Sequence, residues 1–250
     1  MDYLGWRQKF GVTTPSTNAV VQPEYDSMRP PGVTNHLARM HITNIQTIDD
    51  DSFARSIEMI DAGLEGAVER VMTCDPGHLV LGISALAVWG GSLASCTALT
   101  ARMQQLAGRP IGTTHAVDAV LRGLELHDAG RRIAILTPYY PVIEPRMDAI
   151  FAEAGYRIMR FHHLRGASPL QYTHVTDRDM IAGLRQVDGP DVDVIVQFGA
   201  NLPMARLADE AERWLDKPVL SINVATYWAA LRAVGIDDRL YGFTRLFSSF

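Results

Sequence analysis

The sequence predicts an α/β protein made of two Rossmann-like halves, each built on a parallel sheet. Short apolar runs alternate with helical patterns at the spacing of β–α–β units. Two stretches are especially alike, residues 79–91 and 193–203: each begins as an apolar run, breaks into small and polar residues and resumes as a helical pattern. Such strand ends bind ligands in open α/β sheets, so two facing halves predict a cleft between them.

Eight runs have the length and apolar content of strands buried in a parallel sheet. In chain order they are Arg7–Thr13, Asn35–Met40, His78–Ile83, Ile111–Thr113, Arg132–Thr137, Tyr156–Arg160, Val192–Gln197 and Val219–Asn223.

The segments between these strands have the apolar spacing of helices that cover a sheet. The predicted helices are Ser52–Val71, Gly91–Ala107, Ala116–Leu126, Pro141–Ala154, Asp177–Gln186, Pro203–Leu215 and Ala225–Ala233. A strand passes into a helix at Gly112–His115, near the middle of the chain, which suggests the seam between the halves. We therefore expect residues 1–115 with 218–250 to form the first half and residues 116–217 to form the second.

Composition and charge argue against several classes of partner. The chain has 250 residues, of which 47% are hydrophobic and 20% charged, enough for a large core. A net charge of −5 without long runs of like charge predicts no nucleic-acid partner and no membrane partner. No apolar segment approaches about 18 residues and the N-terminus has no signal core, so we expect a cytoplasmic protein.

Cys74 and Cys96 are the only cysteines. A chain of this length does not need a disulfide to fold, so we expect two reduced thiols. Neither the spacing of these cysteines nor their neighbours indicates a metal site.

Several short motifs are distributed along nearly the whole chain: Pro15-Ser16-Thr17-Asn18, Pro30-Pro31-Gly32-Val33, Gly90-Gly91, Thr113-Thr114, Thr137-Pro138-Tyr139, Asn201-Leu202 and Lys217-Pro218-Val219-Leu220-Ser221-Ile222-Asn223. Taken in their order and spacing, these motifs resemble those of the maleate cis-trans isomerases and arylmalonate decarboxylases of the aspartate/glutamate racemase superfamily. The resemblance implies two halves related by pseudo-twofold symmetry, an active site between them, and no metal or organic cofactor.

The catalytic thiols that the resemblance implies are missing. In the superfamily a cysteine usually ends the key strand of each half, where its thiolate acts as base or nucleophile. Counting back from the glycine pair and from Asn201 places Ile83 and Gly199 at these two positions. Cys74 precedes the first of these strands and Cys96 lies in the following helix, so both are expected to be structural. A two-thiol racemase is excluded, and covalent isomerisation lacks its nucleophile.

The groups expected to bind a carboxylate remain. The loop containing Pro15, Ser16 and Asn18 offers amide and hydroxyl donors, although Asn18 could instead cap a helix. The backbone amides of the loops after the paired strands are expected to form an oxyanion hole. In the alternative interpretation, Gly82 and Gly199 only mark tight turns. The predicted binding residues are Pro15, Ser16, Asn18, Ile83, Ala85, Gly199, Ala200 and Asn201.

Three residues are candidates for the chemistry. Tyr139 matches a family tyrosine that hydrogen-bonds the substrate. His115 is predicted at a helix N-terminus, where it would be a neutral acid/base group or merely a cap. Ser84 is a candidate nucleophile with no assigned partner. Tyr140 is expected to be a packed aromatic residue, and His162, His163 and His174 are expected in solvated loops.

These observations predict a cofactor-independent lyase of decarboxylase type, or an isomerase, acting on a small carboxylate or dicarboxylate. An enolate-like intermediate would be held by an oxyanion hole, with acid/base groups other than cysteine. One alternative is a hydrolase or lyase with activated water in the room beside Gly199, and another is a non-catalytic homologue that binds small acids. Whether the chain is a homo-oligomer is left open. The C-terminal stretch of residues 240–250 is expected to pack on the body or on a neighbour.

Overall fold

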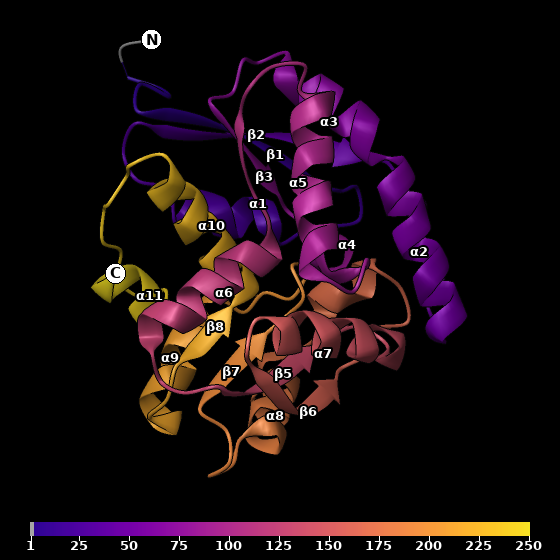
Figure 1. Ribbon diagram of the computed structural model, residues 1–250, viewed down its shortest axis with the longest axis vertical. Coiled ribbons are helices and arrows are strands. Elements are labelled where there is room, and N and C mark those ends of the chain that lie inside the picture. Colours follow the sequence, from indigo (N-terminus) through magenta and orange to yellow (C-terminus); the bar gives the residue numbers. More distant parts are fainter. Residues whose placement is uncertain (1–2) are drawn as a thin grey trace.

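Two four-stranded parallel sheets form the two lobes of the protein in this computed structural model, which describes residues 3–250 (Figure 1). The first sheet has the strand order β2-β1-β3-β4 and the second has the order β6-β5-β7-β8. The strands of the first sheet are β1 (Gln8–Pro15), β2 (Val33–Met40), β3 (His78–Leu81) and β4 (Gly112–Thr114). Those of the second are β5 (Arg132–Thr137), β6 (Arg157–His163), β7 (Val194–Gln197) and β8 (Val219–Ser221).

All eight predicted strands are present, and the two-lobed α/β class is confirmed. The largest difference is at β6, which continues to His163 rather than ending at Arg160. It does so because Phe161, His162 and His163 remain paired with Ile135, Leu136 and Thr137 of β5. The strand therefore carries two histidines that the sequence placed in a loop.

Helices of the first lobe lie mainly on the side of its sheet seen at the right of Figure 1. The segment predicted as one helix, Ser52–Val71, forms two helices that meet at Gly63. A Cβ atom at Gly63 would lie 3.2 Å from Met40 and 3.3 Å from the amide of His41, so the chain passes close to the end of β2 here. The helices are α1 (Val21–Ser27), α2 (Asp50–Ala62), α3 (Leu64–Met72), α4 (Ser84–Val88) and α5 (Leu93–Leu106).

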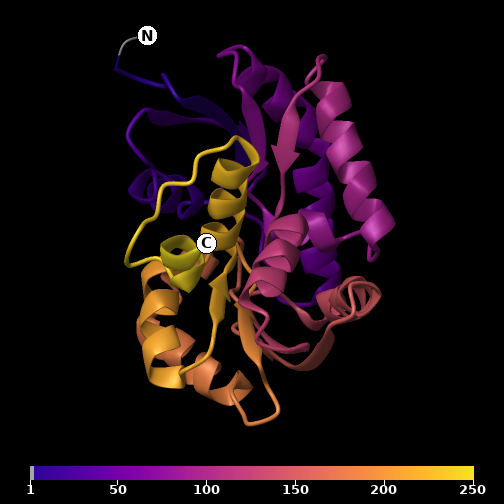
Figure 2. The same cartoon turned by 60° about the vertical axis from the view of Figure 1, so that its left-hand side comes forward.

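The remaining helices flank the second sheet or join the lobes. The second sheet is flanked by η1 (Pro141–Ile143), α7 (Glu144–Glu153), η2 (Leu170–His174), α8 (Asp177–Val187) and α9 (Ala205–Leu215). Two further helices, α6 (Ala116–His127) and α10 (Ile222–Ala233), pack against each other, as Figures 1 and 2 both show. Because α10 also contacts β3 and β4, it lies against the first lobe.

The chain after residue 218 does not return to the first lobe at once. Strand β8 pairs with β7 in the second sheet, and only the following helix, α10, packs on the first lobe. The run after Lys217 therefore extends the sheet that contains β7. The division of the chain at residues 115 and 217 stays a prediction. Of residues 218–250, which it assigns to the first half, the strand β8 lies in the second sheet.

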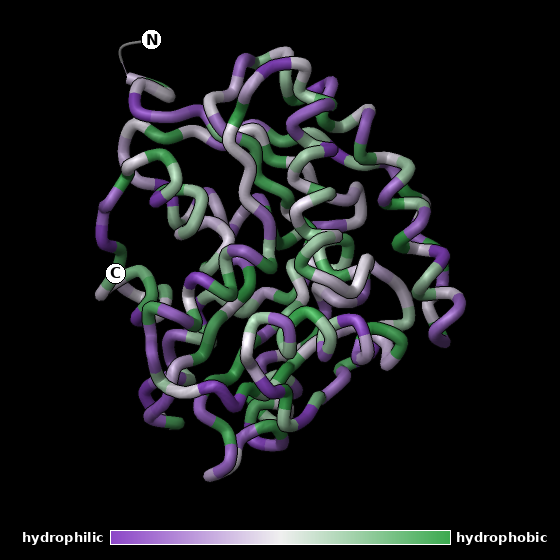
Figure 3. Tube along the Cα trace, viewed as in Figure 1, coloured by the Kyte–Doolittle hydropathy of each residue, from purple (hydrophilic) through white to green (hydrophobic). Residues whose placement is uncertain are grey.

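One of the two hydrophobic clusters is shared between the lobes. Ile133 and Ile135 of β5 pack into the same cluster as the first lobe, whereas Ala134 and Leu136 face a second cluster beneath α8 and α9. This alternation follows the two-residue period of a strand covered on both faces. The hydropathy-coloured trace in Figure 3 shows the apolar segments gathered along the strands.

The C-terminal segment packs on the body of the chain, as expected. Phe243, Leu246 and Phe247 are buried around the short helix α11 (Arg245–Ser249). The carbonyl oxygen of Phe250 accepts hydrogen bonds from Trp228 Nε1 at 3.3 Å and from Arg232 at 2.6 Å. In the part of the chain that the structure describes, no helix has the length and apolar character needed to cross a membrane.

Candidate active site

A cavity lies between the lobes, at the carboxyl ends of β1, β3, β5 and β7. Its empty space is about 400 Å³, the mouth included. Both lobes contribute to it, as the paired strand ends predicted. The lining residues are Pro15, Thr17, Asn18, Phe53, Ser56, Ile57, Ile60, Ile83, Ala85, Tyr139, Pro169, Tyr172, Ala200 and Asn201.

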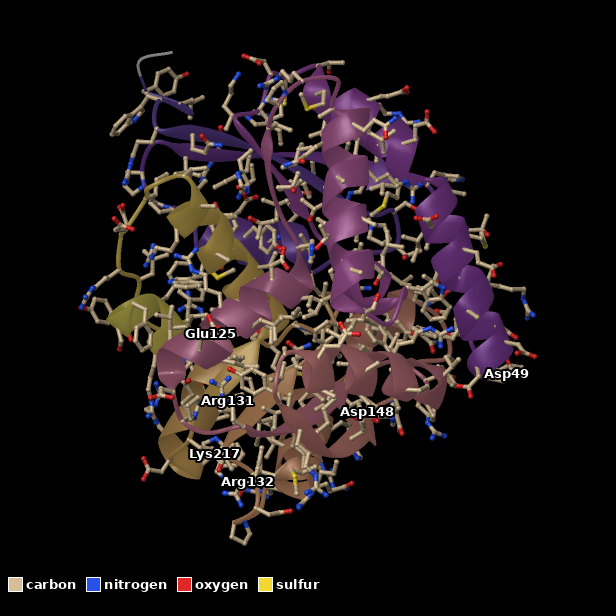
Figure 4. All side chains as sticks on the ribbon, in the orientation of Figure 1. Asp49, Glu125, Arg131, Arg132, Asp148 and Lys217 are labelled. Carbon is tan, nitrogen blue, oxygen red and sulfur yellow. The ribbon has the colours of Figure 1, made fainter. Side chains whose placement is uncertain are left out.

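None of these lining residues carries a charge or a histidine ring. Asp148 and Arg132, two charged residues labelled in Figure 4, lie on the outside of the second lobe. An acid in this cavity would therefore be held by neutral donors, which is how oxyanion holes work in water-poor sites. Among residues 3–250 no group of three or more His, Cys, Asp or Glu side chains is placed to hold a metal ion.

Tyr139 and Ser84 bring the two lobes together at the cavity. The Tyr139 hydroxyl lies 2.8 Å from Ser84 Oγ, and the amide N–H of Ala200 donates to that same Oγ at 3.2 Å. Tyr139 reaches the cavity because Thr137 ends β5: the Tyr139 amide donates to Thr137 Oγ1 at 3.2 Å. Ser84, the first residue of α4, is completely buried behind the wall.

The phenol of Tyr139 is kept neutral by its surroundings. Burial raises the pKa of Tyr139 to about 12, although hydrogen bonding with Ser84 and with the amides of Ala85 and Ala200 lowers it in part. Near pH 7 this side chain is a hydrogen-bond and proton donor rather than a phenolate. The Ala85 amide comes from the first lobe and the Ala200 amide from the second, and the latter donates to Ser84 Oγ beside the phenol.

Asn18 and Asn201 form reciprocal links between the lobes. Asn18 Nδ2 donates to the carbonyl of Ala200 at 3.2 Å, and Asn201 Oδ1 accepts from the amide of Ala19 at 3.0 Å. Asn18 Oδ1 also accepts the amides of Val20, the N-cap residue of α1, and Val21, its first residue, which is close to the capping role that was the alternative to carboxylate binding. Both asparagines line the cavity, but their polar atoms position the loops around it.

Ser16 and Gly199 are not among the lining residues. The Ser16 hydroxyl donates to the Ile42 carbonyl at 2.9 Å and accepts the Ile42 amide at 3.0 Å, so it holds the loop after β2. A Cβ atom at Gly199 would lie 2.3 Å from Pro138 Cδ. The space beside Gly199 is thus filled by a proline ring, which leaves no room there for the water that the sequence suggested.

Ile83 occupies the expected position of the first thiol and lines the cavity. Neither actual cysteine lines it. Cys96 is buried with Sγ donating to the Ala87 carbonyl at 3.3 Å, and burial raises its pKa to about 11. Cys74 is half-buried and donates to the Val71 carbonyl at 3.1 Å. Both thiols are free and have structural surroundings, as predicted.

The structure does not bring His115 to the cavity. It precedes α6, is almost completely buried, and its Nε2 lies 3.1 Å from Asp118 Oδ2. Burial lowers the pKa of His115, and the Asp118 carboxylate opposes that shift in part. Tyr140 is buried and donates to the Thr47 carbonyl at 2.5 Å, outside the lining, in agreement with its expected packing role.

Helices α2 and η2 supply a wall that the sequence did not predict. Phe53, Ile57 and Ile60 come from one face of α2, and Tyr172 comes from η2. The i, i+4, i+7 spacing on α2 marks an apolar face, yet spacing alone cannot say which neighbour that face covers. The loop before α2 crosses to the second lobe, where the Thr47 amide donates to the Ala167 carbonyl at 2.9 Å.

Comparisons with known proteins agree with this fold. Maleate isomerase from Nocardia farcinica (strain IFM 10152) is 24% identical over 246 residues, covering 96% of this chain and 95% of that protein. The structure of a cysteine-to-serine variant of N. farcinica maleate cis-trans isomerase, with a covalently bound succinylcysteine intermediate, aligns with a TM-score of 0.85 at 22% identity, covering 97% and 99% of the two chains.

A liganded double variant of arylmalonate decarboxylase aligns with a TM-score of 0.81 at 23% identity, covering 97% of this chain and 99% of that one. These structural likenesses show the shared fold. The family described as arylmalonate decarboxylase matches residues 45–247, which is most of the chain. This protein therefore belongs to the arylmalonate decarboxylase family.

Proposed function

We propose that this protein is a cofactor-independent lyase that decarboxylates a small dicarboxylic acid of the malonate type. The observation that carries the proposal is the neutral Tyr139 phenol, 2.8 Å from Ser84 Oγ and faced by the amides of Ala85 and Ala200. These groups resemble an oxyanion hole with a proton donor built into it.

Decarboxylation demands less of the cavity than the other reactions of the family. When the C–C bond breaks, its electron pair moves into the remaining carboxylate and carbon dioxide leaves, so neither base nor nucleophile is needed. The enediolate that remains must be stabilised and then protonated at carbon. Amide donors supply the first requirement, each worth roughly 3 kcal/mol when well placed, and a phenol supplies the second.

Tyr139 is the proposed proton donor. Its O–H proton passes to the carbanionic carbon, which is a far stronger base than a phenolate, and the phenolate regains a proton from water. Ser84 Oγ lies 2.8 Å from the phenol oxygen and accepts the Ala200 amide, so it holds the phenol in place at the cavity wall. His115 has no role in this proposal because it does not line the cavity.

The lining favours a substrate with an apolar substituent. Phe53, Ile57 and Ile60 form an apolar wall on the α2 side, and such a wall strengthens electrostatic interactions in the cavity by excluding water. The names of the relatives, maleate isomerase and arylmalonate decarboxylase, support a small dicarboxylate as substrate.

An isomerase of the covalent kind is the less favoured candidate. The N. farcinica isomerase structure contains a succinylcysteine intermediate, whereas the lining of this cavity has no cysteine. Ser84, the candidate nucleophile, does not line the cavity and is completely buried behind its wall. A non-catalytic binder of small acids stays the alternative if no turnover is found.

The test is turnover of phenylmalonate and maleate, followed by proton NMR in D₂O. Decarboxylation would give phenylacetate with deuterium on its α-carbon. We expect Tyr139→Phe and Ser84→Ala each to lower kcat at least tenfold, about 1.4 kcal/mol in the barrier. Tyr140→Phe is the matched control, since this neighbouring tyrosine does not line the cavity. Binding of both acids without turnover would instead indicate the non-catalytic homologue.

A further inference from the structure

His163, at the carboxyl end of β6, lies between two acceptor groups. Its Nδ1 is 2.8 Å from the carbonyl oxygen of Tyr139, and its Nε2 is 2.6 Å from Glu144 Oε1. Its side chain is only 8% exposed and stacks on Phe161 with ring centroids 5.9 Å apart. This placement differs from the solvated loop expected from the sequence.

The proton positions in this bridge follow from the chemistry of its atoms. A backbone carbonyl can only accept, so Nδ1 must carry a proton and donate it to Tyr139. A second proton lies in the 2.6 Å contact between Nε2 and the Glu144 carboxyl group, because two lone pairs would repel at that distance. The imidazole is therefore fixed at both nitrogens.

His163 links the two ends of the chain segment that carries the Tyr139 phenol. Tyr139 follows β5 and Glu144 begins α7, so His163 joins the two ends of the segment between them. The other side of Tyr139 is held by Thr137, whose Oγ1 accepts the Tyr139 amide and donates to the Phe198 carbonyl at 2.7 Å. Without His163 the carbonyl side of Tyr139 would lose its protein hydrogen bond.

We infer that His163 is a positioning residue for the proposed reaction, acting through the Tyr139 carbonyl, with Glu144 orienting its ring. The inference rests on the proposed function in so far as Tyr139 serves catalysis. The hydrogen bond donated by Nδ1 keeps the phenol within reach of Ser84, and the ring itself and its size are not required. A misplacement of even 1 Å at a reacting group lowers turnover strongly.

Two amide variants separate the two nitrogens of His163. In His163→Asn the side-chain NH₂ stands near the position of Nδ1 and can still donate to Tyr139. In His163→Gln it stands near the position of Nε2 and can reach Glu144 instead. We expect His163→Asn to keep kcat for phenylmalonate within about threefold, and His163→Gln to lose roughly tenfold in kcat with KM changed less than twofold.

A second readout needs no substrate. Tyrosine labelled with ¹³C at Cζ gives one NMR resonance for Tyr139, assigned by its loss in Tyr139→Phe. We expect this resonance to shift in His163→Gln and to stay near its original position in His163→Asn, with both variants folded by circular dichroism. Equal resonances or equal losses of kcat in the two variants would overturn the inference. A shift confined to His163→Gln in a protein that turns over neither acid would support the positioning role and contradict the proposed function.

Discussion

At the scale of single residues, Ile83 and Gly199, the two positions at which a thiol was expected, are not equivalent. Ile83 lines the cavity, so a side chain there points toward the space that a substrate would occupy. Gly199 does not, because Pro138 fills the position of its absent Cβ atom. The glycine is thus required by the close approach of a proline ring, a constraint that counting along the sequence cannot show.

We predict that a thiol is tolerated at residue 200 and not at residue 199. Gly199→Cys should lower the free energy of unfolding by about 1 to 3 kcal/mol, because its Cβ atom would lie 2.3 Å from Pro138 Cδ. Ala200→Cys, at the neighbouring position that lines the cavity, should cost less. Urea unfolding followed by circular dichroism measures both values, and equal stability of the two variants would contradict the overlap with Pro138.

At the scale of secondary-structure elements, α2 decides how large and how apolar the cavity is. It begins with a capping box between Asp49 and Ser52, and Figure 4 shows Asp49 at the end of α2 nearest the second lobe. The amide of Val142, in η1, donates to Asp50 at 3.0 Å. The helix is therefore held to both lobes while its Phe53 and Ile57 side chains face the cavity.

Shortening Ile57 should affect both stability and substrate preference. Ile57→Ala removes a buried side chain from the cavity wall and should cost about 2 to 5 kcal/mol of unfolding free energy. The enlarged cavity should favour bulkier malonates, seen as a rise in kcat/KM for naphthylmalonate relative to methylmalonate. Glu58→Ala, on the exposed side of the same helix, is the control. An unchanged preference in Ile57→Ala would mean that α2 does not contact the substrate.

The strands could be predicted from the sequence because a parallel strand covered on both faces is a continuous apolar run. Tyr139 could be predicted because it follows such a run directly. The break between α2 and α3 could not, since it depends on how closely Gly63 approaches the end of β2. Asn18 has two interpretations in the sequence, a helix cap and a carboxylate-binding residue. Its Nδ2 donates to the carbonyl of Ala200, 182 residues away, and a contact over that separation cannot be read from the local sequence.

At the scale of the whole molecule, the half-buried side chain of Glu24 joins the lobes. Its Oε1 accepts the Ala205 amide at the start of α9 at 2.9 Å, and its Oε2 accepts from Asn223 at 2.6 Å. Asn223 also donates to the Ala200 carbonyl at 3.1 Å, which connects Glu24 to the cavity loop. Burial raises the pKa of Glu24 to about 7, the largest effect, while these hydrogen bonds lower it in part.

A raised carboxyl pKa makes the fold less stable as the pH rises. The folded chain binds the Glu24 proton more tightly than the unfolded chain, whose carboxyl titrates near its usual 4.5. The stability from this group is thus complete below pH 4.5 and is lost as the pH rises toward 7, with a slope of at most about 1.4 kcal/mol per pH unit. Glu24→Gln should flatten this part of the profile.

Urea unfolding between pH 4.5 and 8 measures the effect, comparing the unaltered protein with Glu24→Gln. Asp26→Asn, an exposed acid on the same helix, serves as the control and should leave the slope unchanged. Parallel profiles for the unaltered protein and Glu24→Gln would show that this carboxyl group titrates normally in the folded chain.

The core that the lobes share has a consequence for how the protein unfolds. Ile133 and Ile135, from β5, one of the two inner strands of the second sheet, pack in the same cluster as the first lobe. Neither sheet can lose its structure without exposing apolar surface of the other, so the architectural halves form one cooperative thermodynamic unit. Two sheets that look separable in a ribbon diagram should therefore melt in a single heat-absorption peak.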